Sequence, residues 1–239
     1  MKKLLLVLLF VPLVSFGQDP SRQKKCEGIT LAGGNGYGSS ADQLSSPNGI
    51  AFDDSGNLYI ADSNNYRIQK WAPGMNQYAT EGTTVAGGNS LIGGIAFDDS
   101  GNLYIATPNN HHIQKWAPGA TEGTTVAGGN GYGSAADQLS VPANIIIDNS
   151  GNLYIADLGN HRVQKWAPGA SEGVTVAGGN GYGSSADQLS SPNGIAFDDS
   201  GNLYIADSNN HRIQKWAPGA TEGKTVAGGN GKGSSADQL

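Results

Sequence analysis

The sequence predicts an all-β fold, a β-propeller of four blades with four antiparallel strands in each blade. The first observation is a repeat: the string that fills residues 194–216 occurs four times, and its tryptophan recurs at steps of 45, 50 and 50 residues, at Trp71, Trp116, Trp166 and Trp216. The second is periodicity, because each copy alternates β-branched or aromatic residues with small or polar ones and has no 3.6-residue period. Four short strands in about 40 to 50 residues are typical of a propeller blade.

Each copy supplies its strands and turns in the same order. In the last copy the strands are expected at residues 195–198, 203–207, 212–216 and 225–227. The Asp-Ser-Gly-Asn string before the second strand suits a hairpin turn, since aspartate favours turn starts and glycine accepts a positive φ. Ser-Asn-Asn then turns the chain into the third strand, and Ala-Pro-Gly interrupts the sheet before the fourth.

One polar pair recurs inside the predicted blades. An aspartate ends the second strand and an arginine begins the third in three copies, at Asp62 and Arg67, Asp157 and Arg162, and Asp207 and Arg212. Buried polar groups need partners, so each aspartate is expected to bond backbone groups or its arginine and to stabilise its blade.

The repeated string resembles the NHL repeat. The segments that carry the resemblance are Gly-Ile-Ala-Phe-Asp at residues 194–198, Gly-Asn-Leu-Tyr-Ile-Ala-Asp at 201–207 and Asn-His-Arg-Ile-Gln-Lys-Trp at 210–216. The resemblance extends over residues 28–239 and implies a propeller, commonly of six blades. It implies no single function, because the family includes lyases, lactonase-like relatives, RNA binders and ligase-associated interaction modules.

The chain divides into a signal peptide, a polar lead-in and the propeller, at residues 1–17, 18–27 and 28–239. Repeats are expected at about 48–86, 94–127, 144–177 and 194–227. Residues 28–34 match the fourth-strand string, so a lone strand is expected before the first blade. The last copy runs into the connector between blades. We therefore expect the blades to form an open or incomplete part of a larger, six-bladed ring, either as a fragment or as a partial ring that assembles.

The start of the chain indicates secretion. Lys2 and Lys3 precede an apolar run from Leu4 to Phe16, followed by Gly17, with cleavage expected before Gln18. The run is too short to span a membrane, so no membrane insertion is expected after cleavage. Cys26 is the only cysteine, which excludes an internal disulfide.

Composition limits the partners. The chain has 37 glycines, 14% charged residues and a net charge of -6. An acidic surface disfavours nucleic acid, whose backbone is bound by lysine and arginine.

The long Gly-rich connectors and the turns between the second and third strands should share one end of the propeller. The candidate residues there are expected to bind a protein, peptide or glycan, since aromatic side chains on loops of a rigid scaffold are good anchors. They are Tyr37, Asp42, Tyr132, Asp137, Tyr182, Asp187, His161 and His211. Tyr66 and His112 are expected in the same short turns, with His111 beside them. The connectors are expected to lie outside the blade packing. The alternative is that these connectors merely cross between blades.

Other chemistries find less support in the pattern. The histidines occur one per blade, which argues against convergence on one metal ion. The aspartate pairs of the first turns, at residues 53–54, 98–99 and 198–199, lack the spacing of a calcium loop, and a turn explains them without a metal. The alternative is a ring of aspartates from the inner strands that holds a cation at one mouth of the channel, formed by Asp53, Asp98, Asp148 and Asp198. Gly-Gly-Asn-Gly-Tyr-Gly at residues 33–38 lacks the strand-to-helix context of a phosphate loop. No cofactor is expected.

Repetition also bears on catalysis. An active site needs different groups at different positions, whereas this chain offers nearly the same groups four times. Of five glutamates, four recur in the same Glu-Gly turn, at Glu81, Glu122, Glu172 and Glu222. The sequence thus predicts a secreted, non-enzymatic binding or scaffold module. The alternative is part of a propeller lyase or lactonase-like enzyme whose catalytic residues lie in other blades.

Overall fold

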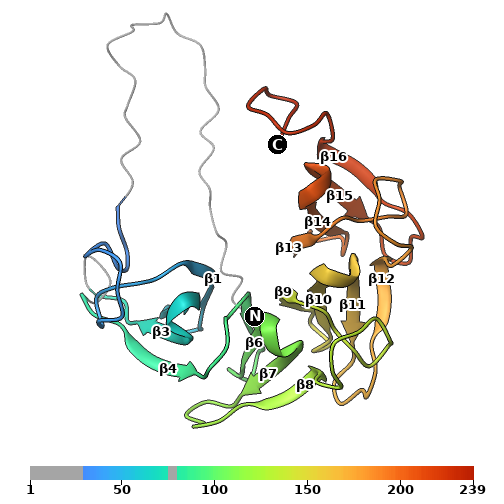
Figure 1. The fold of residues 1–239 in the computed structure, drawn as a ribbon. Coiled ribbons are helices and arrows are strands. Elements are labelled where there is room, and N and C mark those ends of the chain that lie inside the picture. Colours follow the sequence, from blue (N-terminus) through green and yellow to red (C-terminus); the bar gives the residue numbers. More distant parts are fainter. Residues whose placement is uncertain (1–28, 75–79) are drawn as a thin grey trace, which may run out of the picture. The chain divides into compact units, whose positions relative to one another are not determined.

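The computed structural model describes residues 29–74 and 80–239, and residues 31–239 form one compact unit. The predicted signal peptide, residues 1–17, the lead-in, residues 18–27, and Cys26 lie outside the described residues. Within the compact unit the chain forms four four-stranded antiparallel sheets (Figure 1). The predicted all-β fold with four blades is confirmed.

The strands follow the predicted order in every blade. Blade one contains β1 (Pro47–Phe52), β2 (Leu58–Asp62), β3 (Arg67–Trp71) and β4 (Thr83–Gly87). Blade two contains β5 (Ile95–Phe97), β6 (Leu103–Thr107), β7 (His112–Trp116) and β8 (Thr124–Gly128). Blade three contains β9 (Pro142–Ile147), β10 (Leu153–Asp157), β11 (Arg162–Trp166) and β12 (Val174–Gly178). Blade four contains β13 (Pro192–Phe197), β14 (Leu203–Asp207), β15 (Arg212–Trp216) and β16 (Lys224–Gly228).

A single 3-10 turn joins the second strand to the third in each blade. These turns are η2 (Ser63–Asn65), η3 (Pro108–Asn110), η4 (Leu158–Asn160) and η5 (Ser208–Asn210). Each ends on a residue with left-handed backbone, namely Tyr66, His111, His161 and His211. In blade two this residue is His111, and His112 already begins β7, so the expectation that His112 occupies the turn is wrong.

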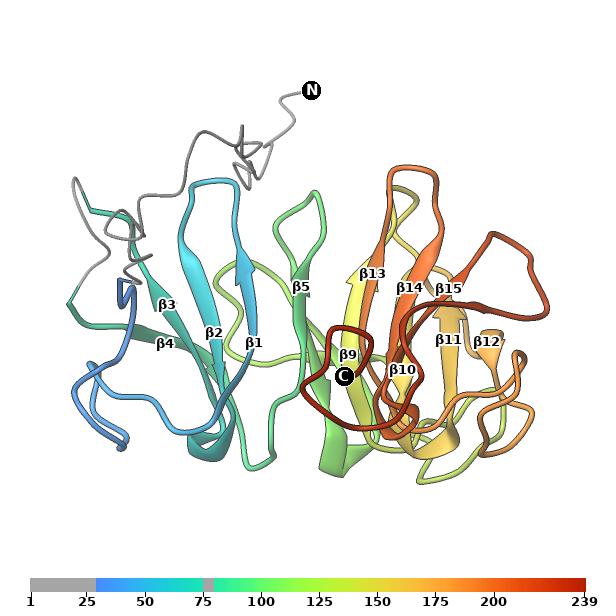
Figure 2. The same cartoon turned by 90° about the horizontal axis from the view of Figure 1, so that it is seen from above.

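Successive blades pack through their first strands. β1 contacts β5, β5 contacts β9 and β9 contacts β13, while no comparable contact joins β1 to β13 among the described residues. Figures 1 and 2 show the blades following one another in this order without blade four reaching blade one. The expected open arrangement is what the compact unit has; the six-blade count remains a prediction.

The core lies at the junctions between blades because both faces of every blade are apolar. The alternation of a strand sends its side chains to opposite faces. On β6, Ile105 joins the cluster shared with blade one, and Ala106 joins the cluster shared with blade three. Trp166 and Trp216 complete the second and third junctions in the same way. A blade is thus stabilised mainly by its neighbours, as expected of a repeat protein.

The predicted lone strand at residues 28–34 is not formed within the part that the structure describes, residues 29–34. Instead Ala32 packs with Leu44 onto Leu58, Ile60 and Trp71, on the face of blade one opposite blade two. The reason is that pairing needs a neighbouring strand, and β4 already closes blade one as its fourth strand. The segment therefore packs its Ala32 side chain against blade one but makes no β-sheet hydrogen bonds with it.

The unpaired face of blade one gives an internal control for the energy of a junction. Ile195 and its counterpart Ile50 occupy equivalent positions on the first strands, but their exposed fractions are 8% and 63%. Replacing Ile195 by Ala should lower the free energy of unfolding by about 2–4 kcal/mol, since it opens a cavity in a packed core. Ile50→Ala should cost less than about 1 kcal/mol. Urea denaturation of both variants measures this, and equal losses would contradict the junction account.

Candidate functional site

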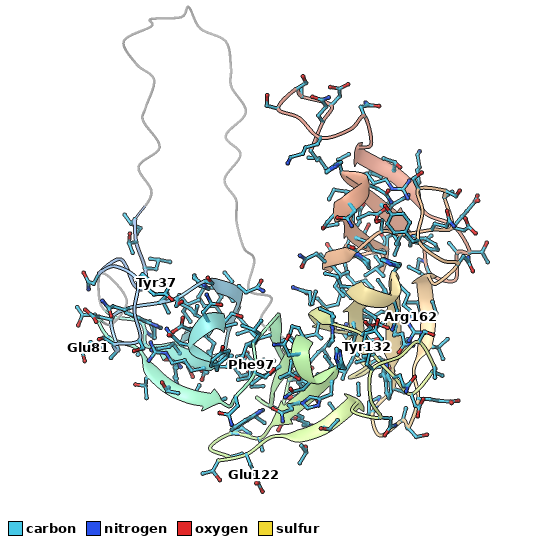
Figure 3. All side chains as sticks on the ribbon, viewed as in Figure 1. Tyr37, Glu81, Phe97, Glu122, Tyr132 and Arg162 are labelled. Carbon is cyan, nitrogen blue, oxygen red and sulfur yellow. The ribbon has the colours of Figure 1, made fainter. Side chains whose placement is uncertain are left out.

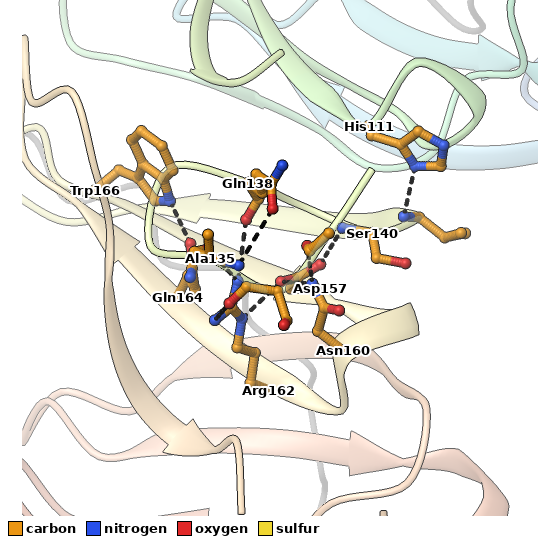
Figure 4. A network of polar contacts seen from close by, with 12 residues as sticks. His111, Ala135, Gln138, Ser140, Asp157, Asn160, Arg162, Gln164 and Trp166 are labelled. Atoms are coloured by element: carbon orange, nitrogen blue, oxygen red, sulfur yellow. Dashed lines mark hydrogen bonds and ion pairs between the residues drawn. The ribbon is translucent and has the colours of Figure 1, made fainter. Parts of the chain in front are cut away.

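Each long connector is held by a buried carboxylate. In blade three Asp157 is fully buried, and its Oδ1 accepts a hydrogen bond from Ser140 N at 2.6 Å. Its Oδ2 accepts from Arg162 Nε and Asn160 Nδ2, both at 2.7 Å (Figure 4). Burial raises the pKa of Asp157, against the effect of these donors, which lower it. The predicted bonding of this aspartate to backbone and arginine is confirmed, and both partners are used.

We call the pair of Asp157 and Arg162 the clamp of blade three, and its arginine also binds the connector loop. Arg162 Nη1 donates to Ser134 O at 2.8 Å, and Nη2 donates to Ala135 O and Gln138 O at 3.1 and 3.0 Å. The next residue of the connector, Leu139, is fully buried. The expectation that connectors lie outside the blade packing is therefore wrong for their bases, because a buried ion pair and a buried leucine anchor them.

A third contact of the connector was not foreseen from the sequence. The glycine of the Glu-Gly turn donates its backbone N–H to an alanine carbonyl of the connector, at 2.8 Å in each case, from Gly82 to Ala41, Gly173 to Ala136 and Gly223 to Ala186. An added Cβ at Gly173 would lie 2.3 Å from Trp166 Nε1, so this position excludes side chains. The only sequence signal for this contact is that the Glu-Gly turn and the connector alanine recur together in these copies.

The connector tips carry the exposed aromatic side chains. Tyr37, Tyr132 and Tyr182 are 80%, 69% and 67% exposed. His161 packs edge-on against Tyr182 with ring centroids 5.4 Å apart, and its Nδ1 accepts from Ser191 N at 3.1 Å. The structure therefore brings these two predicted site residues together, across a blade junction.

The same arrangement recurs one blade earlier. His111 packs against Tyr132 at 5.2 Å, and its Nδ1 accepts from Val141 N. His111 thus belongs to the site, although only His161 and His211 were proposed for it. His211 has the same turn position, but the connector that follows has Lys232 in place of tyrosine.

The connector aspartates act within their own loops. The side-chain amides of Asn35, Asn130 and Asn180 donate to one carboxylate oxygen each, at 3.0, 3.1 and 3.1 Å, on Asp42, Asp137 and Asp187. All three aspartates are half-buried. These bonds tie the two ends of each connector loop together. Only the other carboxylate oxygen of each aspartate is left for the predicted binding of a ligand.

The turn aspartates have local partners as well. Asp198 Oδ1 accepts from Ser200 N and Asn202 N, and Asn202 Nδ2 donates to Oδ2 at 2.8 Å. The side-chain bond from Asn202 is the largest cause that lowers the pKa of Asp198 to about 2. A carboxylate satisfied by its own turn needs no metal, and the described residues hold no group of three or more acidic, histidine or cysteine side chains placed to hold one.

Glu81 and Glu122 are exposed on the turns before the fourth strands (Figure 3). Within residues 29–74 and 80–239 no helix has the length and hydropathy needed to span a membrane.

Blade two departs from this scheme. Thr107 replaces the buried aspartate and His112 the arginine, at the start of β7. Burial, followed by the nearby His111, lowers the pKa of His112, so this side chain is neutral near neutral pH. Blade two therefore has no clamp, in keeping with its short connector.

Comparison with known proteins identifies the repeat. The family model of the NHL repeat matches residues 44–71, 139–166 and 189–216. Each match begins at the leucine that anchors a connector and ends at the blade tryptophan. Blade two, which lacks the long connector, is not among the matched segments. No curated protein matches the sequence.

Solved structures share the fold at low identity. A gluconolactonase from Xanthomonas campestris is 17% identical with a TM-score of 0.60, over 79% of this chain and 66% of that one. An auxiliary nutrient binding protein from Bacteroides thetaiotaomicron is 22% identical with a TM-score of 0.56, over 71% of this chain and 47% of that one. This chain thus spans just under two thirds of the gluconolactonase and about half of the binding protein.

These relatives correct one prediction. The sequence predicted a chain that is not an enzyme, on the ground that its repeats are nearly symmetric. A gluconolactonase has the same fold, so enzyme-type relatives exist and the prediction is contradicted. The physical error was to treat repeat symmetry as excluding a site, because fold and active site are separable.

The clamp can be tested against an exposed ion pair of the same blade. Arg162→Leu should lower the free energy of unfolding by about 3–5 kcal/mol, because it leaves the Asp157 carboxylate buried without its partner. Lys165→Leu removes a pair to Asp148 of 4.0 Å whose side chains are partly exposed, and should cost less than about 1 kcal/mol. Thermal and urea unfolding provide the measurement. Equal effects of the two substitutions would refute the clamp.

Proposed function

This chain is an NHL-repeat β-propeller, and we propose that its connector tips bind a repeating chain ligand, a glycan, outside the cytoplasm. The observation that carries the proposal is the recurrence of an exposed tyrosine on a rigidly anchored loop, at Tyr37, Tyr132 and Tyr182. Two of these rings are oriented by an edge-on histidine. The loops thus offer aromatic surface with little conformational freedom left to lose.

The ligand class follows from the repetition and from the uncharged polar groups that flank each tyrosine. Identical binding points suit a ligand that presents the same unit repeatedly, which a polysaccharide does. The residues around each tyrosine are glycine, serine and asparagine, whose polar groups can bond hydroxyls. Several weak contacts on one chain combine into a tighter one, since the later contacts form within an existing complex. A protein or peptide partner is the other class that this surface suits.

The tyrosines give the direct test. Replacing Tyr37, Tyr132 and Tyr182 together by Ala should weaken binding on a glycan array by orders of magnitude, at about 1–2 kcal/mol for each buried anchor. The melting temperature should change little, because these rings are exposed. Val174→Ala, which removes another exposed apolar side chain, is the control. Unchanged binding in the triple variant would place the ligand elsewhere, and unfolding would show that the tyrosines belong to the core.

A second candidate is hydrolysis of a sugar lactone, favoured by the fold shared with a gluconolactonase. Such an activity would need catalytic groups beyond those that the four blades repeat. Purified protein should then release gluconic acid from gluconolactone above the spontaneous rate, and chelation followed by return of divalent metals would show whether a metal is required. A rate equal to buffer alone, with and without metals, would remove this candidate.

Export is the remaining part of the proposal. A cationic start, an apolar run of residues 4–16 and a small residue at Gly17 support a cleaved secretory signal. N-terminal sequencing of protein recovered outside the cytoplasm should begin at Gln18. Recovery of exported protein that begins at Met1 would contradict the cleavage.

A further inference from the structure

Blade two contains a cavity at the position where the other blades hold their connectors. Its volume is about 390 Å³, within the range of ligand pockets. The apolar part of its lining is Ile92, Ile105 and Trp116, and the polar part includes Asn89, Thr107 and Asn110. The chain from Gly87 to Gly94 is too short to cover this surface, whereas the segment from Gly178 to Gly194 is nine residues longer.

The first sign that a ligand fits here is an unused donor. Gly82, Gly173 and Gly223 each donate their N–H to a connector alanine carbonyl at 2.8 Å. Their counterpart Gly123 lines the cavity, and no hydrogen bond of its N–H is found within the described residues. A backbone donor without a partner in the lining of a partly apolar cavity favours a ligand that brings a carbonyl.

The second sign is a missing leucine. Leu139 and Leu189 are fully buried, and an added Cβ on Gly128 or Gly178 would lie 3.0 or 2.9 Å from their Cδ1 atoms. At the equivalent Gly87 the nearest atoms belong only to Tyr66 and Arg67. Ile92 packs into the junction, yet Gly87 and Ile92 both still border the cavity. Ile92 thus takes the part of the leucine in the junction cluster without covering Gly87, and the side of the leucine's place next to Gly87 is open.

The third sign is the exposure of the blade interior. The glutamine of the third strand has an exposed fraction of at most 1% in three blades, at Gln69, Gln164 and Gln214. The equivalent Gln114 of blade two is half-buried and lines the cavity. His112, at the position of the clamping arginine, has a buried Nε2 without a partner. Blade two thus has neither a long connector nor the aspartate and arginine that anchor one in the other blades.

We propose that this cavity binds a peptide from another protein, with the chemistry of the missing connector: small residues followed by a leucine. The leucine side chain enters beside Gly87, Ile105 and Trp116, and the carbonyl of a small residue accepts from Gly123 N–H. Three blades of the same chain show this mode with the peptide attached in cis, with a fully buried leucine in two of them and the partly buried Leu44 in the third. Without an arginine clamp, the bound peptide exchanges. The site is separate from the tyrosine tips.

The test uses a synthetic peptide with the sequence of residues 180–190, Asn-Gly-Tyr-Gly-Ser-Ser-Ala-Asp-Gln-Leu-Ser, titrated into ¹⁵N-labelled protein. The amide of Gly123 and the indole N–H of Trp116 should shift, and the peptide with Leu189→Ser should bind at least about tenfold more weakly, as expected when one buried leucine is lost. The Tyr37, Tyr132 and Tyr182 triple Ala variant should bind the peptide unchanged.

Gly88→Leu tests the location. Gly88 lines the cavity, and an added Cβ there meets no heavy atom within 4 Å, so the variant should fold and block binding. A second blocking variant inserts Gly-Tyr-Gly-Ser-Ser-Ala-Asp-Gln-Leu between Asn89 and Ser90, which supplies the connector in cis. Peptide binding that survives both changes, shifts confined to Trp71 or Trp216, or no shift at millimolar peptide would each overturn the proposal.

Discussion

In blades one, three and four, the buried pair between an aspartate at the end of the second strand and an arginine at the start of the third fixes the connector that precedes the blade. The aspartate accepts a backbone N–H of the connector, from Ser45, Ser140 or Ser190. The arginine donates to backbone carbonyls of the same connector. A buried carboxylate is costly unless its partners are all present, so the connector has one conformation that satisfies it. The leucine anchors and the aromatic tips depend on that conformation.

Blade two shows what the constraint controls. With Thr107 and His112 in place of the pair, there is no buried charge to satisfy, and the connector is short. The blade still folds, because Ile105, Ile113 and Trp116 pack against blades one and three. Junction packing thus holds the fold, and the polar pair holds the loops. This division explains how one scaffold can carry both repeated tips and a single open cavity.

Much of the fold could be predicted from the sequence, because strand alternation and the Trp-to-Trp period are local signals. The Asp157 to Arg162 pair was also foreseen, since both residues flank one turn. The position of His112 was missed because two adjacent histidines obscure the register of the turn. The donor role of the Glu-Gly turn was missed because the acceptors of Gly82, Gly173 and Gly223 lie in another segment, and backbone contacts between segments leave little trace in a sequence. Residues 29–34 have the sequence of a fourth strand but form no strand, because a strand also needs a neighbouring strand to pair with, and the segment's own sequence does not show whether one is present.

Amide hydrogen exchange at the connector serines tests the clamp most directly. Ser45, Ser140 and Ser190 donate their N–H groups to buried carboxylates, whereas Ser90, at the equivalent place in blade two, has no such acceptor. The account predicts that the first three amides exchange as slowly as the central strands of their blades and that Ser90 exchanges much faster. Equal protection of all four, or fast exchange at the three clamped serines, would contradict it.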